Sequence, residues 1–407
     1  MFSGLPHYYN LILSRLNNVR GLEIVVVSPA QKGQSIGGGV YETKEGINFK
    51  CIFLEQYDSL YKKFFKGFDK ILEEEKPDVV VTIFFFAFSF LYNRKVKKVM
   101  KKQGIKLIYK DIPFRLPKYE DAITHFTNLK AGINGSWLKK QIFKVAASVY
   151  RNISKKLYQR FDAHVNYVEE ARNVFGSYGV DQEKIFITYN SIDNEVINDR
   201  KQKVLSLPPI LPDNPYRIFH VGRLIEWKRV NMLVDAVHKL KEKYPRIELL
   251  IIGNGPLQEN LEKQVESLSL ASHVNFLGAI YDQELLGQYF TASSVYVLAG
   301  MGGLSLNETM AWGLPVICSV CDGTEKHLVK DGYNGKIFED GNMDSLAEAI
   351  DYMLSDVERT KKMGQNSQEI IDNHINVHTV INGYLEAFNY VTDNKYKLSY
   401  NAPEKDS

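Results

Sequence analysis

The chain has 407 residues, of which 44% are apolar, so it can bury two hydrophobic cores and its length predicts two or three domains. These values exclude a disordered chain, a fibre and a disulfide-stabilised miniprotein. The longest uncharged apolar run, residues 79–92, is shorter than the roughly 20 residues of a membrane-spanning helix and predicts a buried strand with the segment after it. Three cysteines and the lack of a signal-peptide pattern predict a reducing, cytoplasmic setting.

The net charge of +3 is divided unevenly between the two halves of the chain. Residues 1–190 hold 30 Lys and Arg against 18 Asp and Glu, a balance of +12. Residues 191–407 hold 21 against 30, a balance of −9. We interpret this division as two domains with different partners, the basic one facing an anionic surface such as lipid or nucleic acid.

The first half of the chain predicts a parallel sheet with an irregular beginning. Apolar runs predict strands at residues 23–27, 79–84, 106–109, 163–167 and 185–188. A doubly wound domain normally opens with a buried strand, but here a short segment around Gly4 leads directly into a helical pattern at residues 8–16. Either the first strand is supplied in an unusual way, or the native chain is longer.

A proline-rich stretch separates the two halves. Residues 193–216 lack periodicity and contain four prolines, Pro208, Pro209, Pro212 and Pro215, which predicts a linker. After it, apolar runs at residues 217–221, 247–252, 274–277, 295–298 and 315–318 alternate with helical patterns at residues 230–243, 257–268, 285–290 and 306–312. This alternation predicts an α/β fold with a parallel, doubly wound sheet whose ligand site lies at the carboxyl ends of its strands.

These patterns predict two domains and a closing helix. The first domain would span residues 1–195 and the second residues 196–375. A helix at residues 376–400 would cross back to the first domain, and residues 401–407 would form a tail.

Two cations follow the strand predicted at residues 217–221. Gly222 ends this strand, and Arg223 and Lys228 lie on the loop that leads to the next helix. An arginine fork and a lysine point charge at this place can neutralise a pyrophosphate. The same residues could equally form a solvent-exposed basic loop.

A glycine turn follows the strand at residues 247–252. Gly253 and Asn254 stand where a backbone without side chains can approach a ligand. Gly255 and Pro256 predict a tight turn and a first helical residue, and the whole segment could be no more than that.

A second glycine segment begins at Gly300, after the strand at residues 295–298, and opens a helix. The unpaired amides and the dipole of a helix N-terminus favour an anion, so this loop could hold a phosphate and a sugar. Ser305 and Glu308 also fit a capping box, in which Glu308 would only hold its own helix end.

Five motifs in the second half stand in a fixed order. They are Gly222-Arg223-Leu224 with Lys228, Gly253-Asn254-Gly255-Pro256, Gly303 with Glu308 and Pro315-Val316-Ile317, Gly323-x-Glu325, and Asp331-Gly332-Tyr333-Asn334-Gly335. This order resembles the nucleotide-sugar half of retaining GT-B glycosyltransferases, the large family that includes sucrose synthases and bacterial lipid-directed mannosyltransferases. The resemblance covers roughly residues 160–390 and implies two doubly wound Rossmann-like domains facing across a cleft.

The resemblance implies a donor site and a role for its residues. The residues that would line this site are Gly222, Arg223, Lys228, Gly253, Asn254, Met301, Gly302, Gly303, Leu304 and Glu308. Arg223 and Lys228 would hold the donor diphosphate during catalysis, and Glu308 would accept hydrogen bonds from the ribose. The amides of residues 301–304 would face the phosphate and the transferred sugar. One residue departs from the family pattern, because Gly300 stands where the first Glu of Glu-x7-Glu is usual.

The chemistry implied for this site is mainly electrostatic, so we expect neither a cofactor nor a metal. The expected donor is a UDP- or GDP-linked sugar. Cys318 and Cys321 have the spacing of half a zinc site, but no second pair accompanies them, which favours small residues that end a strand.

The acceptor side is less clearly marked in the sequence. Lys110-Asp111 ends the strand at residues 106–109, where the family often places a histidine and an aspartate facing the acceptor. Asp111 is our first acceptor-side candidate and Arg115 our second, although both could form salt bridges in a loop. Gly4 would lie in the glycine loop that the family has near donor and acceptor.

Two basic segments in the first half could contact an anionic membrane surface. Residues 122–161 and residues 94–110 each hold eight basic residues and no acidic one. In the first of these segments apolar residues recur at helical spacing: Leu138, Ile142, Val145, Val149, Ile153 and Leu157. The alternative is an ordinary solvated helix packed on a core.

We therefore predict an enzyme that moves a sugar, with retention of configuration, to a hydroxyl of a lipid-linked or polysaccharide-precursor acceptor at the cytoplasmic membrane face. Two alternatives remain: a nucleotide-sugar epimerase of similar fold, and a non-catalytic partner subunit, which Gly300 favours. A nucleic-acid partner is not expected, because the basic half lacks interleaved aromatic residues that could stack on bases.

Overall fold

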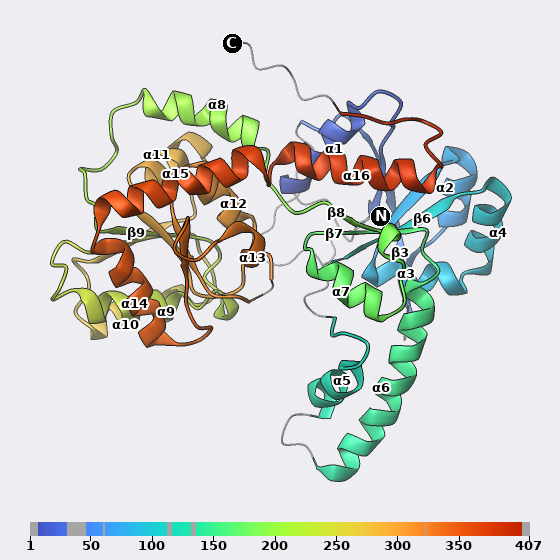
Figure 1. Ribbon diagram of the computed structural model, residues 1–407, viewed down its shortest axis with the longest axis horizontal. Coiled ribbons are helices and arrows are strands. Elements are labelled where there is room, and N and C mark those ends of the chain that lie inside the picture. Colours follow the sequence, from blue (N-terminus) through green and yellow to red (C-terminus); the bar gives the residue numbers. More distant parts are fainter. Residues whose placement is uncertain are drawn as a thin grey trace. The chain divides into compact units, whose positions relative to one another are not determined.

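The computed structural model describes residues 7–30, 46–59, 62–111, 116–131, 136–321 and 323–400 (Figure 1). These residues form two compact units. Unit 1 contains the described residues up to Tyr189 and from His378 onward, and unit 2 is Asn190–Val377. The boundaries thus lie at residues 189/190 and 377/378, whereas the sequence analysis placed them at 195/196 and 375/376.

Unit 2 is built on a six-stranded, entirely parallel sheet. Its strand order is β11-β10-β9-β12-β13-β14. The strands are β9 (Arg217–Val221), β10 (Glu248–Ile252), β11 (Val274–Gly278), β12 (Val295–Leu298), β13 (Val316–Cys318) and β14 (Gly335–Ile337). This order confirms the α/β, doubly wound fold that the alternating pattern predicted.

Helices cover both faces of the unit 2 sheet, which explains why its strands are continuous apolar runs. Because successive side chains point to opposite faces, Ile218 packs on one side and Phe219 on the other. The side of Ile218 is covered by α9 (Val230–Leu240), α10 (Gln258–Ser267) and α14 (Met343–Leu354). The other helices are α8 (Asn194–Leu205), α11 (Gln283–Thr291), α12 (Leu304–Ala311), α13 (Glu325–Leu328) and α15 (Val357–Asn373). Phe219 meets Phe290 of α11, with ring centres 4.9 Å apart.

The linker predicted at residues 193–216 is wrong for its first half. Helix α8 occupies Asn194–Leu205, and the Asp193 side chain accepts a hydrogen bond from the amide of Val196 at 3.4 Å, which caps the helix. Only Ile197 and Val204 of this helix are buried apolar residues, so its sequence lacks a clear amphipathic pattern. The irregular segment is the proline-containing stretch that follows.

Unit 1 contains a four-stranded parallel sheet with the strand order β5-β6-β7-β8. Its strands are β5 (Val79–Ile83), β6 (Lys106–Asp111), β7 (Ala163–Asn166) and β8 (Ile185–Ile187). A parallel pair is formed by β1 (Val25–Pro29) and β2 (Lys50–Leu54), and a hairpin by β3 (Gln56–Ser59) and β4 (Lys62–Phe65). All five predicted strands are confirmed, but β2, β3 and β4 were not anticipated.

The second part of the long apolar run is one of the helices of unit 1. These helices are α1 (His7–Asn17), α2 (Phe68–Glu75), α3 (Phe84–Tyr92), α4 (Arg94–Gln103), α5 (Ala122–Ala131), α6 (Trp137–Tyr158), α7 (Glu170–Ser177) and α16 (Val377–Val391). The apolar run at residues 79–92 is β5 followed by α3, as predicted. Among the described helices, none combines the length and the apolar character needed to cross a bilayer. The described residues begin with α1, so the expected segment around Gly4 lies outside them.

Helix α16 packs against the last strand of the unit 1 sheet, although it follows unit 2 in the chain (Figure 1). A side chain on Gly383 would lie 2.9 Å from the carbonyl oxygen of Ile187, so the helix backbone approaches the end of β8 closely. The rings of Phe186 and Tyr390 lie 5.4 Å apart, and the Tyr390 hydroxyl donates to Glu183. The closing helix is therefore part of the core of unit 1.

Candidate functional site

The strand order of unit 2 creates one place where the loops after two adjacent strands diverge. Strands β9 and β12 are neighbours, with Tyr296 opposite Phe219, but the chain leaves them towards opposite edges of the sheet. Such a switch point is where doubly wound sheets bind ligands. The segments that follow these two strands are residues 222–229 and 299–303, which contain the first and third predicted motifs.

Lys228 joins these two segments. It ends a short 3-10 helix, Glu226–Lys228, and its ammonium group donates to the carbonyl oxygens of Met301 at 2.7 Å and Gly302 at 3.0 Å. In addition, the amide of Met301 donates to the carbonyl oxygen of Trp227 at 2.9 Å. The lysine charge is thus held next to the glycine segment and does not extend into solvent as a mobile side chain.

Two glycines permit the close approach of the loops at this edge. Gly253 has a φ of 139°, and a side chain there would overlap the carbonyl group of Gly222, with 2.9 Å to its carbon. A side chain on Gly300 would likewise overlap the carbonyl group of Trp227, with 2.8 Å to its carbon. The loop geometry therefore excludes a glutamate at position 300, and the departure from the Glu-x7-Glu pattern is built into the packing of the two loops.

The start of α12 does not form the capping box that the sequence allowed. The N-cap residue is Gly303, and no side chain caps the helix in the described part of the chain. The Ser305 hydroxyl instead accepts a hydrogen bond from the Tyr296 hydroxyl at 2.9 Å. The reading in which Glu308 only holds its own helix end is therefore wrong, and the amides of the first turn have no capping side chain.

The expected set of phosphate-facing amides needs one correction. The Met301 amide is bonded to Trp227, so it is not available to a ligand in this structure. Gly302, Gly303 and Leu304 remain candidates, because they follow it directly into the first turn of α12. Sequence reasoning could not separate Met301 from its neighbours, since its partner lies 74 residues earlier in the chain.

Glu308 is a partly buried carboxylate on α12. Desolvation raises its pKa to about 7, and the positive charge of Arg200 opposes that shift only in part. Near neutral pH this side chain exchanges between a charged acceptor and a neutral carboxylic acid. Either form can accept a hydrogen bond from a sugar hydroxyl.

Glu325 is a residue to which the sequence analysis assigned no role. It opens α13 and is fully buried, and its Oε2 accepts a hydrogen bond from the amide of Gly323 at 2.9 Å. Its Oε1 would lie 2.9 Å from a side chain placed on Gly302. The structure thus places a carboxylate against the glycine segment, and the motif Gly323-x-Glu325 was the only signal for it in the sequence.

Arg223 and Arg229 lie on the same loop but differ in their surroundings. The guanidinium of Arg223 is partly buried, 5.9 Å from the ring centre of Trp227. Arg229 forms a bidentate ion pair with Asp340, with 2.6 Å between Nη1 and Oδ1 and 3.3 Å between Nη2 and Oδ2. Asp340 also accepts hydrogen bonds from Ser319 and Cys321, and the hydrogen bond from Arg229 is the main cause that lowers its pKa. Arg229 is therefore a structural cation of the loop.

His220 is a second residue that sequence reasoning missed. It lies on β9, is fully buried, and its Nδ1 is 2.9 Å from the carbonyl oxygen of Val297. Burial, together with a smaller effect of the nearby Lys228 charge, lowers its pKa to about 4, so the ring is neutral at physiological pH. A neutral ring whose Nδ1 donates to Val297 leaves Nε2 as an acceptor. This nitrogen lies 3.5 Å from a side chain placed on Gly222, directly beneath the loop.

In unit 1 the structure describes one of the three acceptor-side candidates. Asp111 ends β6, is partly buried, and its Oδ2 accepts a hydrogen bond from the Tyr109 hydroxyl at 2.6 Å. Gly4 and Arg115 lie outside the described residues. The neighbouring Lys110 points to the opposite face of the sheet, where its ammonium lies 3.8 Å from the ring centre of Tyr9.

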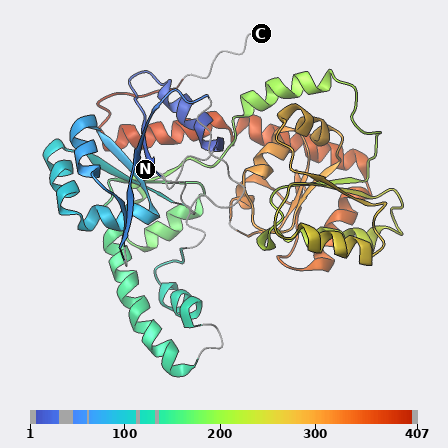
Figure 2. The same cartoon turned by 180° about the vertical axis from the view of Figure 1, so that it is seen from behind.

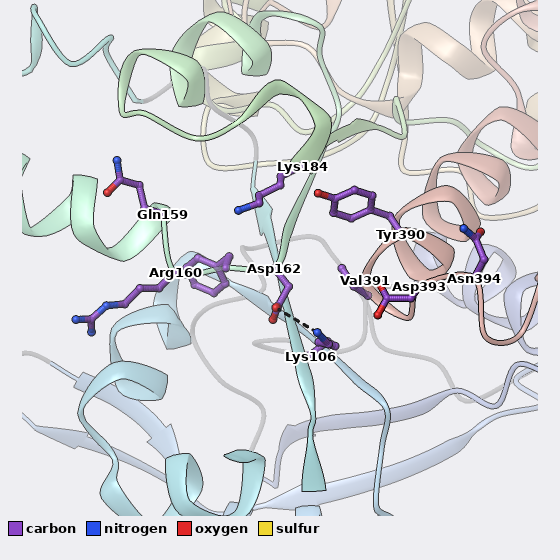
Figure 3. Close-up of a pocket in the computed structure, with 10 residues that line it drawn as sticks. Lys106, Gln159, Arg160, Asp162, Lys184, Tyr390, Val391, Asp393 and Asn394 are labelled. Atoms are coloured by element: carbon purple, nitrogen blue, oxygen red, sulfur yellow. Dashed lines mark ion pairs between the residues drawn. The ribbon is translucent and has the colours of Figure 1, made fainter. Parts of the chain in front are cut away.

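Two cavities lie at the other edges of the sheets. In unit 1 a cavity of 610 Å³ includes Lys106 at the start of β6, Asp162 before β7 and Lys184 before β8 (Figure 3). Lys106 and Asp162 face each other there, 4.0 Å apart. In unit 2 a cavity of 610 Å³ is formed by the proline segment and the residues before β9, β12 and β13. Both cavities are at amino ends of strands, and neither contains a predicted site residue.

Comparison with known protein families assigns unit 2. Residues 207–370 match the model described as glycosyl transferases group 1. Unit 2 is a glycosyltransferase group 1 domain. The matched residues include both loops of the switch point, Glu308 and Glu325.

Two curated relatives of this glycosyltransferase domain illustrate the range of the match. An uncharacterised glycosyltransferase of Haemophilus influenzae is 31% identical over 154 residues, which cover 37% of this chain and 43% of that protein. A GDP-mannose-dependent alpha-(1-6)-phosphatidylinositol monomannoside mannosyltransferase of Mycolicibacterium smegmatis is 28% identical over 163 residues, 38% of this chain and 42% of that protein. The chain thus spans less than half the length of these two relatives.

A solved structure extends the likeness from the glycosyltransferase domain to the fold of nearly the whole chain. Alr3699/HepE of Anabaena, crystallised in complex with UDP, has a TM-score of 0.66 and 19% sequence identity, and the match covers 95% of this chain and 97% of that one. The fold is GT-B, as the resemblance implied. At this identity the likeness establishes the fold alone.

Proposed function

We propose that this chain is a glycosyltransferase that moves a sugar from a nucleoside diphosphate sugar to a hydroxyl of an acceptor, with retention of configuration. One observation carries the proposal: Lys228 and the uncapped start of α12 meet at the switch point of a glycosyltransferase group 1 domain. A cation and free helix amides at one place form a site for an anionic group. The relatives and the HepE–UDP complex support a nucleotide-linked donor.

In this proposal the nucleoside diphosphate is the leaving group. When its bond to the sugar breaks, negative charge grows on the diphosphate and positive charge on the sugar ring. Lys228, Arg223 and the amides of residues 302–304 would stabilise that negative charge, and they are held in place before the reaction. Glu308 would accept hydrogen bonds from the ribose of the donor. With two cations and several amides in this role, the proposed reaction uses no metal ion or cofactor.

The missing side chain at position 300 bears on the sugar end of the site. Glu325 lies against Gly302, so a carboxylate is present beside the segment that would hold the transferred sugar. We assign the sugar end of the donor site to Gly302, Gly303 and Glu325, and we keep Asp111 of unit 1 as the acceptor-side candidate. The acceptor would be a lipid-linked or polysaccharide-precursor hydroxyl, a proposal supported by the name of the mycobacterial relative.

The first experiment is a donor screen with the purified chain. Ligands that bind the native state raise its unfolding temperature by mass action, so UDP, GDP and ADP and their sugars are compared by thermal shift. We expect a shift with UDP or GDP that is lost in the double variant Arg223→Ala with Lys228→Ala. Full retention of the shift in this variant would count against the assigned diphosphate site.

A second measurement separates transfer from the alternatives. Incubation with the bound nucleotide sugar and a mixture of lipid and glycan acceptors should release free nucleoside diphosphate. An epimerase would instead change the sugar and leave the nucleotide linkage intact. A non-catalytic subunit, the alternative that Gly300 favours, would bind the donor and release nothing.

A further inference from the structure

Helices α5 and α6 form a hairpin that projects from the rest of unit 1 (Figures 1 and 2). Helix α6 has 22 residues, and its buried residues are Ala147 at its middle and Ser154, Leu157 and Tyr158 near its C-terminal end. In both views the N-terminal part of α6 lies beside α5 and away from the unit 1 sheet. The projecting part of the hairpin therefore has surfaces that the unit 1 core does not cover.

One of these surfaces is apolar and solvent-exposed. We call it the α6 stripe, and it consists of Leu138, Ile142, Val145, Val149 and Ile153. At 100° per residue these five side chains fall within an arc of roughly 80° on the helix. Val145 is 68% exposed and Ile142 61%, so the stripe faces away from the protein. Leu157, the last residue of the predicted periodic pattern, is buried in the unit 1 core, so the helix packs on a core at that end, whereas the five residues of the stripe do not.

The exposed apolar residues of the chain concentrate on this hairpin. Trp137, which is 74% exposed and begins α6, and Leu129 of α5 are further exposed apolar side chains of the hairpin. With them the hairpin carries seven of the eighteen large apolar side chains that are exposed in the described residues. Single exposed apolar residues are normal on a protein surface, but a continuous row marks an interaction site.

The charges around the stripe have a single sign. Residues 122–161 contain no Asp or Glu, and their eight basic residues are Lys130, Lys139, Lys140, Lys144, Arg151, Lys155, Lys156 and Arg160. Five of them have exposed side chains: Lys130, Lys139, Lys144, Lys156 and Arg160. Arg151 lies over the ring of Tyr119, with 4.2 Å to its centre. The segment that carries the stripe is thus strongly cationic and has no acidic residue of its own.

We propose that the α6 stripe binds the surface of an anionic lipid bilayer, with the apolar side chains in the acyl boundary and the lysines among the headgroups. An amphipathic helix of this kind lies in the interface plane, and each cation near an anionic leaflet strengthens binding about fivefold. A tryptophan at the projecting end fits the same place, because indole rings favour the headgroup level.

The charge pattern favours lipid over the other occupants. A second copy of this chain would bring two basic hairpins together, and like charges repel across an interface. Nucleic acid would satisfy the cations but would leave five aliphatic side chains in water. An anionic bilayer provides headgroups that pair with the cations and an acyl boundary that buries the α6 stripe. The proposal rests on the surface of unit 1 and not on the proposed reaction.

The test is flotation of the full chain with vesicles of phosphatidylcholine and phosphatidylglycerol in equal parts, compared with pure phosphatidylcholine. We expect binding to the anionic vesicles and at least tenfold weaker partitioning to the neutral ones. The variant Ile142→Ser with Val145→Ser and Val149→Ser should lower partitioning at least tenfold. Because these side chains are exposed, the thermal unfolding curve of the variant should match the wild type.

Two charge variants test whether the hairpin itself makes the contact. Lys139→Glu with Lys144→Glu and Lys156→Glu should lower binding to anionic vesicles more than tenfold. The matched control reverses three exposed lysines of α4, which belongs to the same unit: Lys97→Glu with Lys98→Glu and Lys101→Glu. The control changes the net charge by the same amount as the hairpin variant. If the hairpin makes the contact, the α4 control should lose far less binding to anionic vesicles.

Several results would overturn the proposal. These are equal binding to neutral and anionic vesicles, an equal loss in the α4 control, or no effect of the three serine substitutions. A dimer in solution that Ile142→Asp converts to a monomer would assign the stripe to a second copy instead. Donor binding is measured in parallel by thermal shift, so a failure of the proposed reaction remains distinguishable from a failure of membrane docking.

Discussion

The ammonium nitrogen of Lys228 lies 2.7 Å from the carbonyl oxygen of Met301, which joins the loop after β9 to the loop after β12. These two strands are neighbours in space, although β10 and β11 intervene in the sequence. The lysine therefore has two effects: it carries a positive charge at the switch point and it fixes the glycine segment. A substitution there tests both.

We predict that Lys228→Ala lowers donor turnover about 10²-fold or more, because a preorganised cation at the leaving group is lost. Lys228→Arg should recover part of the activity, since the charge returns but the guanidinium does not reproduce the two carbonyl contacts. The measurement is the rate of nucleoside diphosphate release from the donor found in the screen. Lys239→Ala is the control, because that lysine forms an exposed ion pair with Asp344 on the same unit. Near-normal turnover of Lys228→Ala would refute the assigned role.

We predict that Gly300→Ala disrupts donor binding by steric overlap. A methyl group at this position meets the carbonyl group of Trp227, so the two loops must separate, at a cost on the order of 1–3 kcal/mol. Nucleotide affinity should fall at least tenfold by titration calorimetry. Gly176→Ala is the control, because a methyl group there meets only the flexible amide end of Gln182. Unchanged affinity in Gly300→Ala would show that the loops adapt to a side chain.

We predict that Glu308→Gln removes a pH dependence of stability. The folded-state pKa of Glu308, about 7, lies above its ordinary value of 4.5, so the folded protein binds this proton more tightly than the unfolded chain. The stabilisation that comes from this bound proton is complete below pH 4.5 and is lost as the pH rises through 7. Glu308→Gln should therefore be more stable than wild type at pH 8, by on the order of 1–3 kcal/mol, and equal to it near pH 4.5. Urea unfolding at the two pH values measures this difference in the free energy of unfolding. The same difference at both pH values would contradict the raised pKa of Glu308.

We predict that Lys110→Met is tolerated or stabilising. The Lys110 ammonium lies among the rings of Tyr9, Tyr167 and Tyr384, and burial lowers its pKa well below the ordinary value. Methionine fills the same space without the cost of desolvating a charge.

The lowered pKa of Lys110 also means that wild-type stability rises with pH towards 10.5, because the unfolded chain binds the extra proton. The gap in unfolding temperature between Lys110→Met and wild type should therefore narrow at high pH. Lys106→Met, on the same strand but partly exposed, is the control.

The sequence alone determined most of the architecture of unit 2. Its strands are buried on both faces, so each is a short continuous apolar run, and the helices between them keep a helical period. The positions of Arg223, Lys228 and the glycine segments relative to strand ends followed from the same pattern. Unit 1 was harder, since β2, β3 and β4 include exposed and charged residues that hide their strand character.

Only the tertiary structure decided which groups in the candidate site are partners. The bond of the Met301 amide to Trp227, the contact of Glu325 with Gly302, and the overlap that requires glycine at position 300 all join segments separated by more than 20 residues. The sheet order sets these distances, and no local spacing in the sequence encodes that order. The exposure of the α6 stripe is similar: periodicity predicted an apolar face, but only the packing of the hairpin shows that the unit 1 core leaves it uncovered.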